Sequence, residues 1–84
     1  MKVNKKAVLQ EEKGEAILFD PETLLTFWLN ESGILIWKLL SIGESPDSIL
    51  AQMKNKYEVE EEDLRSDLRA FISALTEQGF ISGD

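Results

Sequence analysis

Residues 19–37 constrain the fold most, because this single stretch combines the signals of a turn, a β-strand, a helix cap and a buried helix. Residues 20–23 (Asp-Pro-Glu-Thr) are typical of a turn, since proline presets φ and the preceding aspartate can bond the backbone ahead of it. Residues 24–29 are rich in types that favour β-strands, and Asn30 is a favoured helix N-cap. The stretch therefore predicts a turn, then a strand, then a helix that begins after Asn30.

Two more strands are predicted before this turn. Residues 7–12 can form a short strand, and Gly14 suits the tight turn that follows, because glycine tolerates positive φ. Residues 16–19 are continuously apolar, which favours a central strand covered on part of both faces. The three strands form an antiparallel meander whose last member, 24–29, is an edge strand. The polar residues 1–6 are expected to fray.

Three helices are predicted after the strands. Apolar side chains go most of the way round residues 31–41, which indicates a central helix buried on more than one side. Ser45 and Pro46 start a second helix that runs to about Tyr57 and docks by one face. A third helix is predicted over residues 61–78, with one broad apolar stripe. The stripe consists of Leu64, Leu68, Phe71, Ile72 and Leu75. Strands followed by helices favour an α+β fold with a winged helix-turn-helix-like architecture.

The chain has 84 residues, which suffices for one small domain with a single hydrophobic core, expected to be ordered from about residue 7 to 81. Nine basic and sixteen acidic residues give a net charge of −7, which disfavours nucleic acid and anionic lipid as partners. The absence of cysteine and histidine removes disulfides, thiolate zinc sites and the commonest general base. With no long apolar run and no targeting peptide in the sequence, we expect a cytoplasmic chain that binds no membrane.

The edge strand 24–29 is the first candidate functional element. Its alternating side chains place Leu25, Phe27 and Leu29 on one face and Leu24, Thr26 and Trp28 on the other. Phe27 and Leu29 are expected to pack on the helices, and Trp28 to cover the outer face of the sheet. The unpaired backbone groups of such an edge can also accept a partner peptide as an added strand.

The third helix is the second candidate, because its apolar stripe is broad enough to line a groove as well as the core. Asp67 borders the stripe, where it is either a solvated acid or a contact for a peptide amide, and the sequence alone favours the solvated acid. Arg65 and Arg69 are each expected to pair with a local acid, as charged residues four positions apart on a helix usually do.

Other classes of function find less support. A winged-helix DNA-binding domain is an architectural alternative, but the third helix offers only Arg65 and Arg69 against many acids. A purely structural subunit of a larger enzyme is a further alternative. The acidic run 58–63 lacks the glycine and the alternating oxygen ligands of a calcium loop, and nothing in it indicates a buried carboxylate pair. The sequence therefore predicts neither a metal site nor catalytic residues.

Residues 27–31 (Phe-Trp-Leu-Asn-Glu), followed by Ile36 and Trp37, carry the most specific signal in the chain. Together with Asp67 they resemble the PqqD family, whose members are small leader-peptide-binding domains, also called RiPP recognition elements. The resemblance covers about residues 8–81. It implies that the chain binds the leader segment of a ribosomally synthesised precursor peptide, without catalysis and without a cofactor.

The resemblance also implies where the leader binds. It is held as an extra strand beside residues 24–29, in a groove closed by the third helix, 61–78. The implied contacts are Leu24, Leu25, Thr26, Phe27 and Trp28 on one wall and Arg65, Asp67, Leu68, Phe71, Ile72 and Leu75 on the other. A stand-alone domain of this kind is similar to the leader-binding proteins of lasso peptide pathways, which work with a leader peptidase and a cyclase. The alternative is a peptide chaperone for a radical enzyme in PQQ-type biosynthesis.

Overall fold

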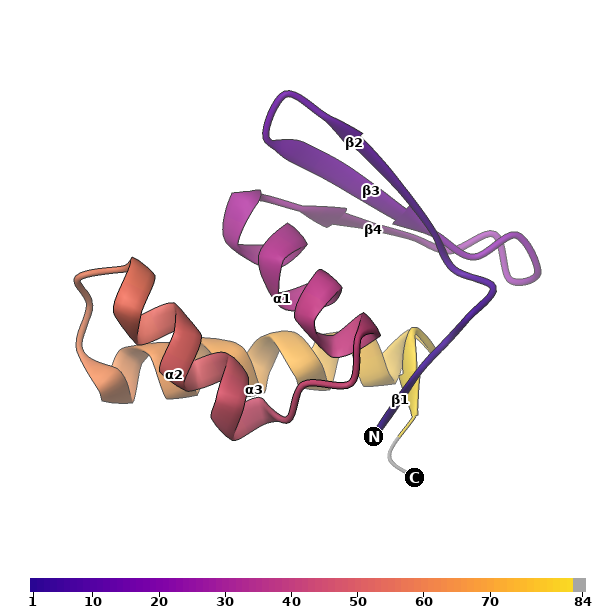
Figure 1. Cartoon of the computed structure of the whole chain (residues 1–84). Coiled ribbons are helices and arrows are strands. Elements are labelled where there is room, and N and C mark those ends of the chain that lie inside the picture. Colours follow the sequence, from indigo (N-terminus) through magenta and orange to yellow (C-terminus); the bar gives the residue numbers. More distant parts are fainter. Residues whose placement is uncertain (83–84) are drawn as a thin grey trace.

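The structure is a computed structural model, and it describes residues 1–82. Its elements in chain order are β1 (Lys2–Val3), β2 (Val8–Glu12), β3 (Glu15–Phe19), β4 (Thr26–Leu29), α1 (Glu31–Ser41), α2 (Pro46–Lys56), α3 (Glu61–Glu77) and β5 (Ile81–Ser82). Strands β2, β3 and β4 form one antiparallel sheet in that order, and the three helices lie on one side of it (Figure 1). The predicted meander followed by three helices is confirmed.

The β2–β3 hairpin has the tight turn that the sequence predicts. Lys13 and Gly14 have φ of 51° and 82°, and Glu12 pairs directly with Glu15, which is the geometry of a two-residue hairpin loop. In β3, however, buried residues alternate with the exposed Ile17. The sequence predicted cover on part of both faces; in the structure the helices lie on one side of the sheet, and the outer face is covered only in part, with Phe19 half-buried and Ile17 exposed.

Strand β4 begins later than the sequence predicts. Leu24 has a φ of 65°, which takes it out of the extended conformation, and its N–H donates to the carbonyl of Asp20 (2.8 Å). The N–H of Asp20 in turn donates to the carbonyl of Leu25 (3.0 Å). The turn predicted over 20–23 is therefore longer, and Leu24 and Leu25 belong to it rather than to the strand.

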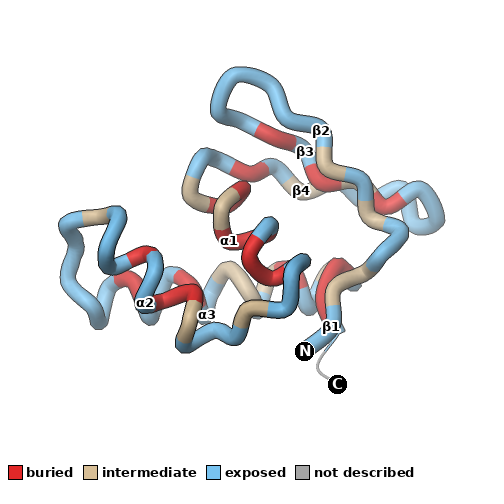
Figure 2. Tube along the Cα trace, in the orientation of Figure 1, coloured by how far each residue is buried: buried red, intermediate tan, exposed pale blue. Residues whose placement is uncertain are grey.

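Helix α1 is the centre of the core, as predicted, and it contacts β3, β4 and α2. The Asn30 side chain caps it by accepting a hydrogen bond from the N–H of Gly33 (2.9 Å). A Cβ atom on Gly33 would lie 3.3 Å from Oδ1 of Asn30 and 3.3 Å from Cδ2 of Leu29, so the backbone of α1 approaches the end of β4 closely. The red segments of Figure 2 show that burial concentrates along α1 and the inner sides of its neighbours.

Helices α2 and α3 have the predicted caps. The Ser45 hydroxyl accepts from the N–H of Ser48 (3.2 Å), and α2 docks by one face. Helix α3 ends before Gly79, whose φ is 83°. The N–H of Phe80 donates to the carbonyl of Leu75 (2.9 Å), and the Phe80 ring is fully buried against the last turn.

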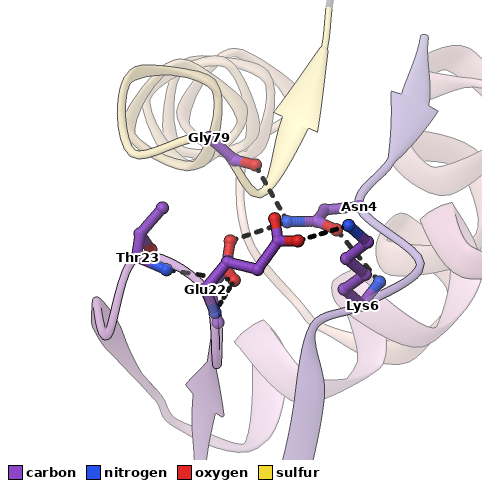
Figure 3. Close-up of polar contacts among 6 residues, drawn as sticks. Asn4, Lys6, Glu22, Thr23 and Gly79 are labelled. Carbon is purple, nitrogen blue, oxygen red and sulfur yellow. Dashed lines mark hydrogen bonds and ion pairs between the residues drawn. The ribbon is translucent and has the colours of Figure 1, made fainter.

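The N-terminal segment differs from the expectation of a frayed end. Lys2–Val3 pairs antiparallel with Ile81–Ser82, and the N–H of Asn4 donates to the carbonyl of Phe80 (2.8 Å). The Asn4 side chain donates to Oδ2 of Asp20 (2.9 Å) and to the carbonyl of Gly79 (3.4 Å), so it joins three segments far apart in the sequence (Figure 3). The two ends of the chain therefore hold each other in place.

Asp20 organises the turn that leads into β4. It is buried, and its Oδ1 accepts from the N–H of Glu22 (2.8 Å) and more weakly from that of Thr23 (3.4 Å). The hydrogen bond from Glu22 is the largest cause that lowers the pKa of Asp20, and burial opposes it. An ion pair between Lys6 and Glu22 lies beside this turn (Figure 3).

Candidate functional site

One edge of the main sheet is open. Strand β4 pairs with β3, and no strand within residues 1–82 pairs with its other edge. Because the Asp20–Leu25 hydrogen bond continues the β3–β4 ladder, the C=O of Leu25 and the backbone groups of Phe27 and Leu29 point toward β3. The N–H and C=O groups of Thr26 and Trp28 therefore point toward the open edge, where an incoming strand can bond them.

Helix α3 contacts the inner face of β4 through a pair of aromatic rings. The rings of Phe27 and Phe71 meet edge to face, with centroids 5.9 Å apart and planes at 86°. Phe27 meets Phe80 in a similar way, at 6.3 Å and 75°. Such aromatic pairs fix a preferred geometry as well as burying area. The cluster therefore sets the spacing between β4 and α3.

A cavity of about 380 Å³ adjoins the end of β4, between the start of α1, the end of α2 and α3. It is lined by Asn30, Ser32, Gly33, Ile36, Leu50, Met53, Tyr57, Val59, Leu64, Asp67, Leu68 and Phe71. Its floor is apolar, while Asn30, Ser32, Tyr57 and Asp67 place polar groups around it. Pockets of this size and character are typical ligand sites, with a few polar groups that fix the orientation of the ligand.

The Tyr57 hydroxyl is the least satisfied polar group of the cavity. It is buried and has no hydrogen-bond partner in the part of the chain that the structure describes. A buried hydroxyl without a partner is costly. The sequence assigned Tyr57 only to the docked face of α2, because its helical spacing shows the face but not the cavity beneath its ring.

The predicted α3 residues separate into three locations. Asp67, Leu68 and Phe71 line the cavity that adjoins the end of β4. Arg65 and Ile72 line a second hollow of about 300 Å³ beside the start of α2, on another flank of the helix. Leu75 is fully buried in the core and presents no surface to a ligand. Leu68 lines both hollows.

The predicted β4 residues also differ in position. Leu24 and Leu25 are exposed in the turn before the strand, while Phe27 faces α3 as expected. Thr26 and Trp28 face the other side of the sheet, as their alternation with Phe27 predicts, and the Trp28 side chain is 58% exposed. Thr26 and Trp28 thus contribute to the open edge through their backbones.

Arg65 pairs with a local acid, as predicted. Its Nη2 donates to Oε2 of Glu61 (3.4 Å), and Nζ of Lys54 donates to Oε1 of the same carboxylate (2.7 Å). The hydrogen bond from Lys54 is the largest cause that lowers the pKa of Glu61, followed by the charge of Lys54 and the bond from Arg65. These charges hold the start of α3 to the end of α2.

The described residues contain neither a grouped set of metal-binding side chains nor a membrane-spanning helix. Within residues 1–82, no three His, Cys, Asp or Glu side chains are grouped so that they could hold a metal ion. None of the helices in that range has the length and apolar character needed to cross a bilayer. The open edge of β4 and the adjoining cavity are therefore the features on which a functional interpretation rests.

Residues 15–81 match the profile of the family described as coenzyme PQQ synthesis protein D (PqqD). The chain belongs to the PqqD family. The resemblance inferred from residues 27–31 and the helices is thereby confirmed, and the match includes the open edge, α3 and all of the cavity lining. PqqD-family proteins are non-catalytic peptide-binding proteins, so this PqqD-family domain is not an enzyme.

Two solved structures have the same fold as this PqqD-family domain. The first, TbiB1 in complex with the TbiA(beta) leader peptide, is 30% identical, with a TM-score of 0.91 over 100% of this chain and 98% of that one. The second, lasso peptide synthetase B1 complexed with the leader peptide, is 26% identical, with a TM-score of 0.82 over 93% and 92% of the two chains. No curated protein matches significantly.

Proposed function

We propose that this PqqD-family domain binds the leader segment of a precursor peptide in lasso peptide biosynthesis and presents the precursor to a leader peptidase and a cyclase. The leader adds as a strand to β4 (Thr26–Leu29), in the groove closed by the third helix. The observation that carries the proposal is the open edge of β4 beside an apolar cavity. The two solved relatives, both complexed with leader peptides, support it.

Backbone pairing supplies affinity that depends little on sequence. Thr26 and Trp28 offer two N–H and two C=O groups to an added strand. A net contribution of about 0.5–1.5 kcal/mol per hydrogen bond gives about 2–6 kcal/mol for the four bonds. Because association itself has a large entropic cost, this sum is too small for tight binding. Side-chain contacts must therefore supply the remaining affinity and the specificity.

The cavity supplies those side-chain contacts. Alternate side chains of an added strand point toward α3, where Leu68 and Phe71 form an apolar wall. A volume of about 380 Å³ accommodates a large apolar or aromatic side chain. Asp67 lies at the same cavity and can bond a polar group at the tip of that side chain or a leader amide.

A peptide chaperone for a radical enzyme in PQQ-type biosynthesis is the second candidate, since the family description names that pathway. Both pathways use the same edge and cavity on this domain. The neighbouring genes separate them: a short precursor gene beside a peptidase and a cyclase supports the lasso pathway, whereas a radical enzyme gene supports the alternative.

A direct titration tests leader binding. A labelled synthetic leader from the neighbouring precursor gene should bind saturably, while a scrambled peptide of the same composition and duplex DNA at moderate salt should not. Phe71→Ala removes the aromatic wall of the cavity and should weaken leader binding by a few kcal/mol, the scale of an aromatic anchor. Failure of the wild-type domain to bind the leader, or tight binding to duplex DNA, would contradict the proposal.

A further inference from the structure

Asn4 bridges the two elements that flank the proposed leader groove. Its Nδ2 donates to Oδ2 of Asp20 (2.9 Å), in the turn that leads into β4, and more weakly to the carbonyl of Gly79 (3.4 Å), just after α3 (Figure 3). Its backbone N–H donates to the carbonyl of Phe80 (2.8 Å). We call these three bonds the Asn4 bridge. Asn4 lies before residue 15, where the match to the PqqD family begins.

Asn4 is itself held in place by the residues that follow it. Its Oδ1 accepts from the N–H of Lys6 (2.9 Å), and its C=O accepts from the N–H of Ala7 (3.1 Å). All of its hydrogen-bonding groups therefore have a partner, so the side-chain amide is held in one orientation. Asp20 is buried, and loss of its bond from Asn4 would leave a carboxylate oxygen short of a donor. The Asn4 bridge is therefore a fixed link between the two elements.

Asp20 connects the Asn4 bridge to the edge where the leader is proposed to pair. The N–H of Asp20 donates to the carbonyl of Leu25 (3.0 Å), the residue before Thr26. Thr26 is the first residue of β4, and its backbone N–H and C=O point toward the open edge. A displacement of Asp20 therefore moves the start of that edge.

The Asn4 bridge and the cavity lie at opposite ends of β4. The cavity adjoins Asn30, after the strand, whereas the bridge holds the turn before it. Helix α3 has Phe71 at the cavity, and Phe80, which bonds Asn4, follows its other end. Between these ends, the Phe27 ring contacts both phenylalanine rings. Aromatic pairs form over centroid distances of about 4.5–7 Å, whereas N–H···O bonds are confined to about 2.7–3.2 Å, so the bridge restricts the separation of β4 and α3 more narrowly.

We propose that Asn4 is a positioning residue for leader binding, because the Asn4 bridge fixes the start of β4 relative to the end of α3 before the leader binds. This inference rests on the proposed leader binding. A leader that pairs with β4 and contacts α3 at the same time requires one separation of the two. Fixing that separation in advance lowers the entropic cost of binding. Without the bridge, the leader has to order the two elements itself, and its affinity falls.

Three variants of Asn4 test the bridge. Asn4→Ala removes both side-chain donors, and Asn4→Ser, which can supply one donor, takes its place if the alanine variant does not fold. Asn4→Asp keeps the shape of the side chain but places a carboxylate against that of Asp20. Two carboxyl groups this close do not both stay ionised at low pH, so one takes up a proton and donates to the other. Acid should therefore restore the bond to Asp20 in Asn4→Asp alone.

Ile49→Val is the matched control for lost stability. Ile49 is fully buried in α2 and lines none of the hollows described above, so removal of one methyl group destabilises the fold away from β4. A residue that only stabilises the fold would affect leader binding no more than Ile49 does. Urea unfolding measures the stability of each variant and verifies that it is folded under the conditions of binding.

Fluorescence anisotropy of a labelled synthetic leader gives the Kd of each protein at about pH 7.5 and about pH 5. Division by the wild-type Kd at the same pH removes the titration of the leader and of Lys6 and Glu22, the ion pair beside this turn. At the higher pH, Asn4→Ala and Asn4→Asp should raise Kd by about fivefold or more, the scale of one hydrogen bond, and Ile49→Val by less than about twofold. At the lower pH, only Asn4→Asp should return to within about twofold of wild type.

The outcomes separate this inference from the proposed function. If the wild-type domain binds the leader and the folded Asn4 variants bind it equally tightly, the positioning role is refuted and leader binding stands. The same holds if Ile49→Val loses as much affinity as they do, because the loss then follows stability, or if Asn4→Asp stays weak at the lower pH. If the wild-type domain does not bind the leader, the proposed function fails, and the positioning role fails with it.

Discussion

Replacing Thr26 with proline tests whether the leader pairs with the open edge, because it removes one outward-pointing N–H and little else. Thr26 is the first residue of β4, and its N–H points away from β3. Proline is tolerated at the first residue of a strand and on edge strands whose N–H faces solvent. Thr26→Val is the matched control, since it keeps both the N–H and a high strand propensity.

The expected loss of affinity follows from one missing hydrogen bond. The bond itself contributes about 0.5–1.5 kcal/mol net, and a leader carbonyl left buried without a partner costs about 1–3 kcal/mol. The cost of the unpaired carbonyl, about 1–3 kcal/mol, corresponds to an increase in Kd of about 5- to 150-fold, because each 1.4 kcal/mol is a factor of ten. Thr26→Val should stay within about twofold of wild type, because it keeps the backbone groups that pair with the leader and its side chain points to the outer face of the sheet.

Fluorescence anisotropy of a labelled leader measures these Kd values, and urea unfolding measured in parallel verifies that both variants fold. The comparison is between Thr26→Pro and Thr26→Val, so that any effect of the lost hydroxyl cancels. A folded Thr26→Pro domain that binds the leader as tightly as Thr26→Val would refute strand addition at this edge.

Three further predictions follow from buried positions. Leu75→Ala should lower the free energy of unfolding by about 2–5 kcal/mol, because Leu75 is fully buried. The leader affinity of the folded domain should stay unchanged. A loss of affinity in the folded domain would show that Leu75 contacts the leader. Gly33→Ala should cost about 1–2 kcal/mol in urea unfolding, since the added Cβ lies 3.3 Å from atoms of Leu29 and Asn30; increased stability would mean that these neighbours move aside. The pKa of Asp20 is lowered by backbone N–H bonds, so its stabilisation is complete above the ordinary aspartate pKa of about 4 and is lost as pH falls through the folded value. The melting temperature should therefore fall less between pH 7 and pH 2 in Asp20→Asn than in wild type. An equal fall in both proteins would show that Asp20 does not cause it.

The parts of the fold that were predicted from the sequence depend on local physical rules. The N-cap at Asn30, the hairpin turn at Gly14 and the helix end at Gly79 each follow from the conformations that a few adjacent residues allow. The pairing of Lys2–Val3 with Ile81–Ser82 follows no such rule, because the two segments are polar or short and their partners lie at opposite ends of the chain. The polar composition of residues 1–6 therefore predicted a frayed end, whereas Lys2–Val3 forms a strand in the structure.

For the candidate site, the sequence predicts which residues share the apolar stripe of α3 but not which way that stripe faces. Helical spacing identifies the apolar stripe of α3, but it does not give the rotation of the helix relative to β4. Contact between Phe71 and Phe27 sets that rotation, which places Asp67 beside the open edge and turns Arg65 toward α2. Leu75 belongs to the same stripe and lies in the core. The sequence prediction assigned all of these residues to one wall of a groove, whereas in the structure they lie on different sides of α3.

The short edge of β4 explains why the cavity is needed. An exposed edge strand invites pairing with other chains, and proteins limit that risk with short edges and charge. Here the turn before Thr26 and the helix cap after Leu29 leave only two residues with outward-pointing backbone groups, and each copy carries a charge of −7. An edge this short binds any peptide weakly, including a second copy of itself. Selective and tight binding therefore requires a peptide that also fills the cavity beside Phe71.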